Sequence, residues 1–309
     1  ADRFLGGEMR LDVAAATAAI ESGIAAPLGM TVTAAASGIL RIAAASMSHA
    51  VKGVTTDRGL SVAAFPTLVA YGGAGPLHAS MVARELRMPR VIIPRAPGHF
   101  SAFGMLLSDF RRDLVRSHFV PLDEVEMTEL ARWFKDMEIA GIDSVKSAAV
   151  DSRRLVISRS LDMRYVGQEH AVNVEVPLDA FHRRDRGALK RAFDAVHEER
   201  YGRGSPQEPA EIVSIRSTVT GVLKKPPLER IARGGAAPRA SAATGKRRVY
   251  FQQGGWVQTP TYRRDALVAG NRIVGPALVE EHASTTVVQP GDVLRVDAFG
   301  NLVIDIARS

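Results

Sequence analysis

The chain contains no cysteine among its 309 residues. This absence excludes disulfide bonds, catalysis by a thiolate, and zinc or iron–sulfur centres held by cysteines. Long hydrophobic runs are also missing, because no apolar stretch approaches the roughly 18–20 residues that a membrane-spanning helix needs. The start of the chain, ADRFLGGEMRLD, lacks the charged-then-apolar pattern of a signal peptide. We therefore expect a soluble protein with no membrane association and a cytoplasmic location.

The net charge of +7 is concentrated in one segment of the sequence. Residues 224–248 hold eight lysines and arginines and one acid, Glu229, which accounts for the whole excess. The segment is rich in proline, glycine, alanine and serine and has no interleaved aromatic residues, which is typical of an exposed linker. A nucleic-acid surface needs more than a basic run, so nucleic acid is not a predicted partner.

The pattern of the sequence changes across this basic segment. Upstream, helical and strand-like stretches alternate, as in an α/β layer structure, and downstream short strands are separated by glycine and proline. We predict an α/β lobe over 1–223 that carries an inserted α+β segment, a basic Pro/Gly/Ala linker over 224–247, and a small all-β domain over 248–309.

Several elements of the lobe are predicted from local signals. Thr31 and Thr33 are possible N-caps of an alanine-rich helix that ends near residue 54. A strand at 67–71 and a strand at 90–94 are separated by one helix, and this short spacing predicts parallel pairing. A charged surface helix over 181–202 ends at Gly202, which is a favoured residue after a helix.

A glycine-rich turn joins the strand at 67–71 to the helix that follows it. Gly72, Gly73 and Gly75 remove side chains at a place where a backbone can pass close to a ligand. The same residues also suit a tight strand-to-helix turn that binds nothing. The spacing matches neither the dinucleotide fingerprint nor a P-loop with its lysine, so the residues alone leave both interpretations open.

Other candidate sites are weaker. Among the eight histidines, His78 and His99 lie closest in sequence to glycine turns, and they are the weak candidates for a catalytic role, although a lone histidine is more often structural. The segment HEERY superficially resembles a zinc-binding helix, but Tyr201 stands where a second histidine is needed. No metal site is predicted.

Six segments resemble, in order, successive landmarks of the hydantoinase A/5-oxoprolinase family, which includes subunits of acetone and acetophenone carboxylases. They are LVAYGGAGPLHA, VIIPRAPGHFSAFGMLLSDFRRD, SLDMRYVGQEH, FHRRDRGALKRAFDAVHEERYG, VYFQQGGW and GPALVEEHASTTVVQPGD. Together they are spread over most of the chain, from residue 68 to residue 292. The family resemblance implies the C-terminal half of an actin-like ATPase fold, similar to Hsp70 and the sugar kinases, with the small all-β domain attached.

The resemblance also implies a nucleotide site and its partners. The glycine turn corresponds to the motif that lets the chain approach the nucleoside, so Gly72, Gly73, Ala74, Gly75 and Pro76 are the expected nucleotide-binding residues. The family's two phosphate-binding motifs normally lie upstream of the region matching RFLGGEMRLD, and this chain does not contain them. ATP and Mg²⁺ would therefore be held mostly by a partner chain that carries the phosphate-binding half, with a hydantoinase B-like subunit as a further partner.

In family terms, the reaction is an ATP-dependent activation of a carbonyl group by phosphorylation. We expect a small-molecule carbonyl substrate, with the opening of a cyclic amide such as a hydantoin or 5-oxoproline as the primary prediction. A subunit of an ATP-dependent ketone carboxylase is the alternative. A third possibility is a non-catalytic assembly subunit with a degenerate ATP cleft. Many relatives carry asparagines near Ala44 and Ser46, and this chain lacks those amide groups. The sequence does not distinguish a fragment, a cleaved product and a separately encoded subunit.

Overall fold

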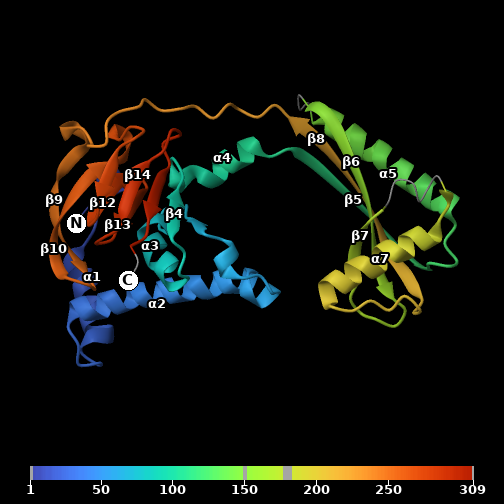
Figure 1. Cartoon of the computed structure of the whole chain (residues 1–309), viewed down its shortest axis with the longest axis horizontal. Helices are drawn as coiled ribbons and strands as arrows, with labels where there is room; N and C mark the ends of the chain where they lie inside the picture. Colours follow the sequence, from blue (N-terminus) through green and yellow to red (C-terminus); the bar gives the residue numbers. More distant parts are fainter. Residues whose placement is uncertain (1–2, 149–151, 177–182, 308–309) are drawn as a thin grey trace. The chain divides into compact units, whose positions relative to one another are not determined.

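The computed structural model describes residues 3–148, 152–176 and 183–307. The chain divides into two compact units (Figure 1). Unit 1 comprises Ala1–Met105 and Pro227–Ser309, and unit 2 comprises Leu106–Pro226. Each unit has its own hydrophobic core, so each is described separately.

Unit 1 begins with short strands and then helices. Its elements up to the unit boundary are β1 (Arg3–Phe4), η1 (Leu5–Gly7), β2 (Met9–Arg10), α1 (Val13–Ile20), the π-helical turn η2 (Glu21–Ala25), α2 (Val32–Val54), η3 (Thr56–Arg58), η4 (Val62–Ala64), β3 (Thr67–Val69), α3 (Gly75–Glu85), β4 (Arg90–Ile93), η5 (Pro97–His99) and α4 (Phe100–Leu107). The elements after the return to unit 1 are η6 (Ala240–Ala242), β9 (Ala243–Phe251), β10 (Gly255–Arg263), η7 (Arg264–Ala266), β11 (Arg272–Val274), β12 (Ala277–Glu281), β13 (Ser284–Val288), β14 (Val293–Val296) and β15 (Leu302–Asp305).

Two sheets organise unit 1. The five-stranded sheet has the order β11-β14-β15-β4-β3, and the four-stranded sheet has the order β13-β12-β10-β9. β3 and β4 pair in parallel, as do β10 and β12, and the other pairings in these sheets are antiparallel. The parallel pairing predicted for the strands near 67–71 and 90–94 is therefore confirmed.

The core of unit 1 lies among these sheets and the helices α2 and α3. Ala79 and Ala83 of α3 are buried, and their small side chains allow the helix to pack closely on β13 and β4. Val91 of β4, Val279 of β12 and Ile304 of β15 are fully buried in the same cluster. The core therefore joins residues from the beginning and the end of the chain.

The units have different boundaries from those expected from the sequence. The segment 248–309 is rich in strands as predicted, but β15 pairs with β4 in the register Leu302↔Ile93, so this segment does not form a domain separate from residues 1–105. Leu302 and Ile93 are both fully buried. The pairing gives one edge of β4 its hydrogen-bond partners, and no local sequence pattern predicts that β15 is the partner strand. The predicted linker also packs in part onto unit 1, because Ile231 lies against its core and Ala242 is buried.

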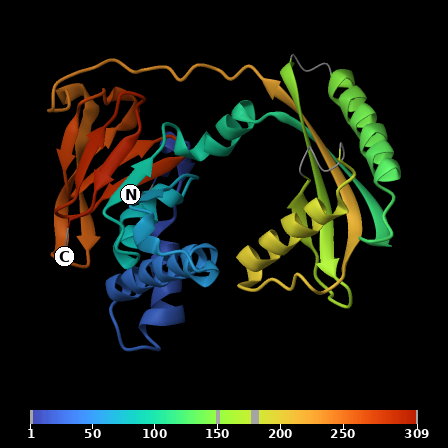
Figure 2. The same ribbon diagram turned by 45° about the vertical axis from the view of Figure 1, so that its right-hand side comes forward.

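Unit 2 is one antiparallel sheet covered by two helices on one face (Figure 2). The strands are β5 (Phe110–Pro121), β8 (Ala210–Leu223), β6 (Ser152–Tyr165) and β7 (Val172–Glu175) in that order, and the helices are α5 (Met127–Ser147) and α7 (Arg186–Tyr201). Phe134 of α5 and Phe193 of α7 are fully buried against Leu161, Met163 and Ile215 of the strands.

Local signals at helix ends behave as predicted. The Thr31 hydroxyl accepts a hydrogen bond from the Ala34 N–H at 3.2 Å and caps α2. Gly202 ends α7 in the left-handed conformation with φ of 74°. No helix among the described residues is long and apolar enough to cross a membrane.

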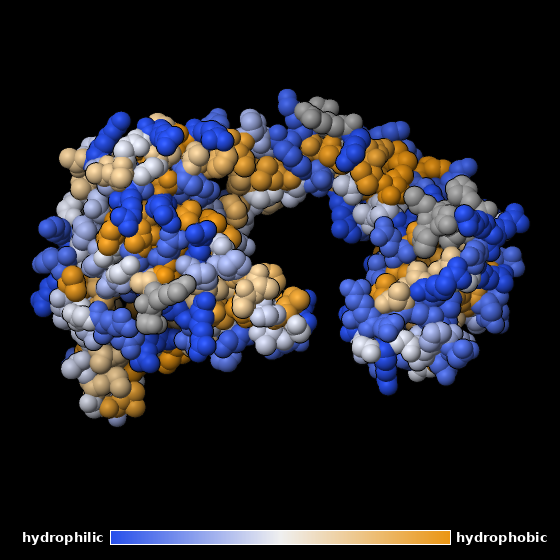
Figure 3. Space-filling model, viewed as in Figure 1, coloured by the Kyte–Doolittle hydropathy of each residue, from blue (hydrophilic) through white to orange (hydrophobic). Residues whose placement is uncertain are grey.

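The first helices of unit 1 carry exposed hydrophobic side chains. Val13 of α1, Leu28 of the turn before α2 and Ile42 of α2 have 51%, 64% and 69% of their surface exposed. Figure 3 shows hydrophobic residues gathered over α1 and the segment that follows it. An exposed apolar surface of this kind commonly marks a site of interaction.

Close packing of α5 on its sheet gives a test of the fold of unit 2. A Cβ atom at Gly141 would lie 2.5 Å from Cγ2 of Val219 and 3.0 Å from Cδ1 of Leu114. We expect Gly141→Ala to lower the free energy of unfolding of unit 2 by about 1–3 kcal/mol, despite the higher helix propensity of alanine.

A matched control lies within α2. A Cβ atom at Gly38 would meet nothing within 4 Å among the described residues, so Gly38→Ala should raise stability by about 0.5–1 kcal/mol. Urea unfolding followed by tryptophan fluorescence separates the two effects, because Trp133 lies in unit 2 and Trp256 in unit 1. An equal or higher stability of Gly141→Ala would show that the helix does not pack as described.

Candidate functional site

The glycine turn lies between β3 and α3. Gly72 has φ of 85°, a left-handed conformation that suits glycine, and its N–H donates to the Pro97 carbonyl at 2.8 Å. A Cβ atom at Gly72 would meet nothing within 4 Å in the described part of the chain. A Cβ atom at Gly73 would lie 3.2 Å from the carbonyl oxygen of Ala283, so that side of the turn is filled by protein. The face of the turn at Gly72 is open in the described part of the chain.

The remaining predicted nucleotide-binding residues form the start of α3. Ala74 precedes the helix, Gly75 is its first residue, and Pro76 lies buried in the first turn. No side chain among the described residues caps this end, and the first turn carries no acid. The helix N-terminus therefore keeps the partial positive charge that favours an anion. The structure thus brings all five predicted residues into one turn, and their nucleotide contact stays a prediction.

The turn between β12 and β13 packs against this glycine turn. Glu281 and Ser284 pair across the hairpin, which leaves His282 and Ala283 as its two loop residues. Besides its contact with the position of Gly73, Ala283 has its Cβ 3.3 Å from the Cβ position of Gly98. The hairpin therefore lies directly beside the turn, and the absence of a side chain at Gly73 favours that packing whether or not a ligand binds.

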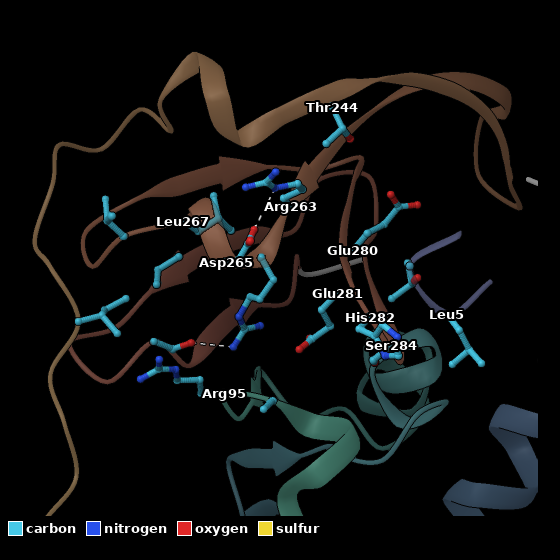
Figure 4. Close-up of a pocket in the computed structure, with 18 of the residues that line it drawn as sticks. Leu5, Arg95, Thr244, Arg263, Asp265, Leu267, Glu280, Glu281, His282 and Ser284 are labelled. Atoms are coloured by element: carbon cyan, nitrogen blue, oxygen red, sulfur yellow. Dashed lines mark hydrogen bonds and ion pairs between the residues drawn. The ribbon is translucent and has the colours of Figure 1, made fainter. Parts of the chain in front are cut away.

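A pocket of about 1020 Å³ lies on the other side of the same hairpin, within unit 1 (Figure 4). Its lining includes Leu5, Arg95, Thr244, Arg247, Arg263, Arg264, Asp265, Leu267, Glu280, Glu281, His282 and Ser284. Two pairs of these charges neutralise each other: Arg247 with Glu280 at 2.9 Å and Arg263 with Asp265 at 3.0 Å. Arg264 and Glu281 make no ion pair within the described residues.

Arg264 is a buried arginine held by backbone carbonyls. Only 9% of its surface is exposed, and Nη2 donates to the carbonyls of Gly300 at 2.6 Å, Pro94 at 3.3 Å and Ile93 at 3.4 Å. Desolvation lowers its pKa to about 10, so the side chain stays protonated at neutral pH. Its Nη1 has no hydrogen-bond partner among the residues that the structure describes.

Glu281 directs its carboxylate into the pocket (Figure 4). Burial raises the pKa of this carboxyl above its usual value, and the charges of Arg264 and His99 partly oppose that shift. Its Oε1 is buried without a hydrogen-bond partner in the described part of the chain, as is Oγ of Ser284. The sequence offered no signal that separates Glu281 from Glu280, because both acids follow three buried apolar residues of β12, one on each face of the strand. Arg264, Glu281 and Ser284 were not predicted as site residues.

The two predicted histidines have different surroundings. His99 ends η5 and acts electrostatically on Glu281 beside the pocket. His78 lies on α3 and lines a second pocket of about 780 Å³ with Met81, Tyr250 and other residues. Burial lowers the pKa of His78, and its Nδ1 has no partner within the described ranges. A catalytic role for either histidine stays a prediction. No group of three or more His, Asp or Glu among the described residues could hold a metal ion.

Comparisons with known proteins cover almost the whole chain. A family profile described as "Hydantoinase/oxoprolinase" matches residues 1–114, and one described as "Hydantoinase/oxoprolinase C-terminal domain" matches residues 123–304. The caprolactamase subunit alpha of Pseudomonas jessenii is 32% identical over 93% of this chain and 42% of its own length. The acetone carboxylase beta subunit of Xanthobacter autotrophicus is 29% identical over 94% of this chain and 42% of its own length.

Solved structures agree with these sequence matches. The crystal structure of the ATP-dependent caprolactamase from Pseudomonas jessenii has a TM-score of 0.77 and 30% sequence identity, and covers 99% of this chain and 45% of that chain. This likeness confirms the predicted fold class, a mixed α/β fold of the actin-like ATPase type with a β domain. The chain spans less than half the length of the relatives that it matches.

The raised pKa of Glu281 predicts how stability depends on pH. Because the pKa is higher in the folded state than in the unfolded state, the protein loses stability as the pH rises through the folded value. We expect Glu281→Gln, which removes the buried charge, to raise the free energy of unfolding at pH 7–8, and this gain should shrink as the pH falls through the raised pKa of Glu281 and be largely lost by about pH 4.5.

The neighbouring acid provides the control for this measurement. Glu280 is partly exposed and paired with Arg247, so Glu280→Gln should change stability by at most about 1 kcal/mol. Chemical unfolding of both variants between pH 4 and pH 8 checks the prediction. Unchanged or lower stability of Glu281→Gln at pH 7 would contradict the assignment of Glu281 as a carboxylate destabilised by burial.

Proposed function

This chain belongs to the hydantoinase/oxoprolinase family, as the resemblance of its motifs predicted, and we propose that it forms part of an ATP-dependent enzyme that activates a carbonyl group by phosphorylation. The observation that carries the proposal is the match of both family profiles together with the open glycine turn at the start of α3. Relatives of the chain are named caprolactamase, 5-oxoprolinase and acetone carboxylase. These names share one type of substrate group, a carbonyl.

The proposed nucleotide contact is the turn of residues 72–76. An adenosine would lie against the bare backbone at Gly72, where a side chain would otherwise stand. The partial positive charge at the N-terminus of α3 would favour its negatively charged part. Most of the triphosphate and the Mg²⁺ would be bound by a partner chain, because phosphoryl transfer needs donors and a metal around the β- and γ-phosphates.

The partners in this proposal follow from the length and the surface of the chain. The matched relatives are named as subunits and are more than twice as long as the matched region. A chain carrying the phosphate-binding half would cover the exposed apolar residues of α1 and α2, among them Val13 and Ile42. A hydantoinase B-like subunit is the second proposed partner. The assembled enzyme would work in the cytoplasm, where ATP is available.

The primary proposal for the reaction is the opening of a cyclic amide. Transfer of the γ-phosphoryl group of ATP to the amide oxygen releases ADP and makes the carbonyl carbon electrophilic. Water then adds to that carbon, the C–N bond breaks, and a carboxylate and inorganic phosphate are formed. Closure of the site protects the phosphorylated intermediate from bulk water, which is consistent with an enzyme of several subunits. The proximity of His99 to Glu281 makes His99 the better candidate for a proton transfer.

A second candidate is supported by the match to the acetone carboxylase beta subunit over 94% of this chain. In that reaction ATP would activate bicarbonate and a ketone, and a carbon–carbon bond would form. A third candidate, a non-catalytic assembly subunit with a degenerate cleft, predicts no ATP turnover that depends on the glycine turn.

ADP release by the chain purified with its co-encoded partners distinguishes these candidates. We expect a cyclic amide or imide to stimulate ADP release in the absence of bicarbonate, because the hydrolysis needs only water as the second reactant. Stimulation that requires both a ketone and bicarbonate would favour the carboxylase instead. Absence of stimulation by either set of substrates would contradict both enzymatic proposals.

A pair of glycine variants tests the nucleotide contact. Gly72 and Gly59 have φ of 85° and 77°, and a Cβ atom at either position would meet nothing within 4 Å among the described residues. Both valine variants therefore introduce similar backbone strain, but only Gly72→Val would obstruct the nucleoside. We expect Gly72→Val to weaken ATP binding by the assembled enzyme at least about tenfold, which is 1.4 kcal/mol.

Gly59→Val serves as the control for folding and strain. Its affinity for ATP should stay within about twofold of the unsubstituted enzyme, which is about 0.4 kcal/mol, because Gly59 lies outside the glycine turn. ATP affinity is measured by titration, and thermal unfolding establishes that both variants fold. Equal ATP affinities for the two variants would place the nucleotide elsewhere.

A further inference from the structure

A cluster of three aromatic rings borders the glycine turn. Tyr71 directly precedes Gly72, and the centroid of its ring lies 5.1 Å from that of Phe100, which in turn lies 6.2 Å from that of Phe103. Tyr71 keeps 51% of its surface exposed, whereas Phe100 and Phe103 are partly buried. The two phenylalanines therefore support the tyrosine ring and leave about half of that residue accessible to a ligand.

The rings come from two loops that follow neighbouring parallel strands. β3 and β4 pair in parallel, so their carboxyl ends lie at the same edge of the sheet. Tyr71 and the glycine turn follow β3, and η5 and α4, which begins at Phe100, follow β4. The Gly72 N–H joins the two loops by its bond to the Pro97 carbonyl at 2.8 Å. Ligands of α/β sheets commonly bind outside the carboxyl ends of such strands.

An exposed aromatic ring beside bare backbone suits a flat aromatic ligand with a sugar attached. A Cβ atom at Gly72 would meet nothing within 4 Å in the described part of the chain, so the backbone next to Tyr71 is uncovered. Consecutive Cα atoms are only about 3.8 Å apart, so a ligand in contact with Gly72 lies within reach of the Tyr71 ring. Nucleobases stack on aromatic side chains through their π faces. An acyclic or saturated ligand gains no such stacking.

We propose that the ring of Tyr71 stacks on the base of the bound nucleotide. The inference rests on the proposed function for placing a nucleotide at the glycine turn, and it adds the side chain that binds the base. The contact with Phe100 restricts the tyrosine ring before binding, so less side-chain freedom is lost when the base stacks on it. Tyr71 therefore contributes affinity for the nucleoside part of the ligand and none for the phosphates.

A protein surface is the alternative partner of an exposed tyrosine, because tyrosine is common in interfaces. Protein partners gain binding energy mainly from side chains that fill pockets of the opposite surface. The turn beside Tyr71 consists of Gly72, Gly73 and Ala74, which offer no side chain larger than a methyl group. The bare turn therefore favours a nucleoside as the occupant.

Two ligands that differ by the nucleoside test the proposal in the enzyme assembled from this chain and its partners. ATP carries the base and the phosphates, and inorganic tripolyphosphate carries phosphates alone. We expect Tyr71→Ala to weaken ATP binding at least about fivefold and to leave tripolyphosphate binding within about twofold. Tyr71→Phe keeps the ring and should bind ATP within about twofold of the unsubstituted enzyme. Unchanged ATP affinity of Tyr71→Ala, or equal weakening of both ligands, would overturn the proposal.

Phe65 provides a matched control at the other end of the same strand. It lies two residues before β3, as Tyr71 lies two residues after it, and 42% of its surface is exposed. Phe65→Ala should therefore leave ATP binding within about twofold of the unsubstituted enzyme. Thermal unfolding establishes that all the variants fold. An equal loss of ATP affinity in Phe65→Ala and Tyr71→Ala would also overturn the proposal.

The yield of the assembled enzyme separates a contact with the base from a contact with a protein. If Tyr71→Ala lowers that yield and the complex that does assemble keeps its ATP affinity, Tyr71 contacts a partner chain and the proposal fails.

The outcome is separable from that of the proposed function. If Tyr71→Ala weakens ATP binding selectively but neither a cyclic amide nor a ketone with bicarbonate stimulates ADP release, the base contact stands and the proposed reaction fails. If these substrates stimulate ADP release and Tyr71→Ala binds ATP as tightly as the unsubstituted enzyme, the reaction stands and the base contact fails.

Discussion

The contact between the carbonyl oxygen of Ala283 and the backbone at Gly73 connects the two halves of the candidate site. A Cβ atom at Gly73 would lie 3.2 Å from that oxygen, so a side chain at residue 73 would require the hairpin to shift by a few tenths of an ångström. On one side of the hairpin lies the turn with its open face at Gly72. On the other side Glu281 and Ser284 line the pocket. The arrangement of the whole site depends on this close approach.

The close approach joins the two sheets of unit 1. The β12–β13 hairpin belongs to the four-stranded sheet, and β3, which leads into the glycine turn, belongs to the five-stranded sheet. α3 follows the turn and packs on β13, so this helix connects the two sheets beside the contact. The glycine turn and the pocket are therefore both bordered by the β12–β13 hairpin.

The sequence predicted those parts of the fold that depend on neighbouring residues. Thr31 caps α2 through a hydroxyl three residues from its donor, and Gly202 ends α7 because only a residue tolerant of positive φ fits there. The pairing of β15 with β4 joins residues more than 200 positions apart, and no local pattern encodes it. The expected boundary at 248 was therefore misplaced, although the strands after it were anticipated.

The candidate site was predictable only in part for the same reason. The glycine turn is contiguous in sequence, so all five of its residues could be named and the structure places them together. Arg264, Glu281 and Ser284 meet through sheet pairing, and each looks ordinary in its own segment. Glu280 and Glu281 end the same apolar strand, and the local pattern does not distinguish the paired acid from the buried one.

The most direct test of this account is a structure of the enzyme assembled from this chain and its partners, determined with a non-hydrolysable ATP analogue. The account predicts that the nucleoside lies in van der Waals contact with the backbone of Gly72 and that the hairpin at Ala283 keeps its contact with Gly73. A nucleoside bound far from this turn, with Gly72 exposed to solvent, would contradict it.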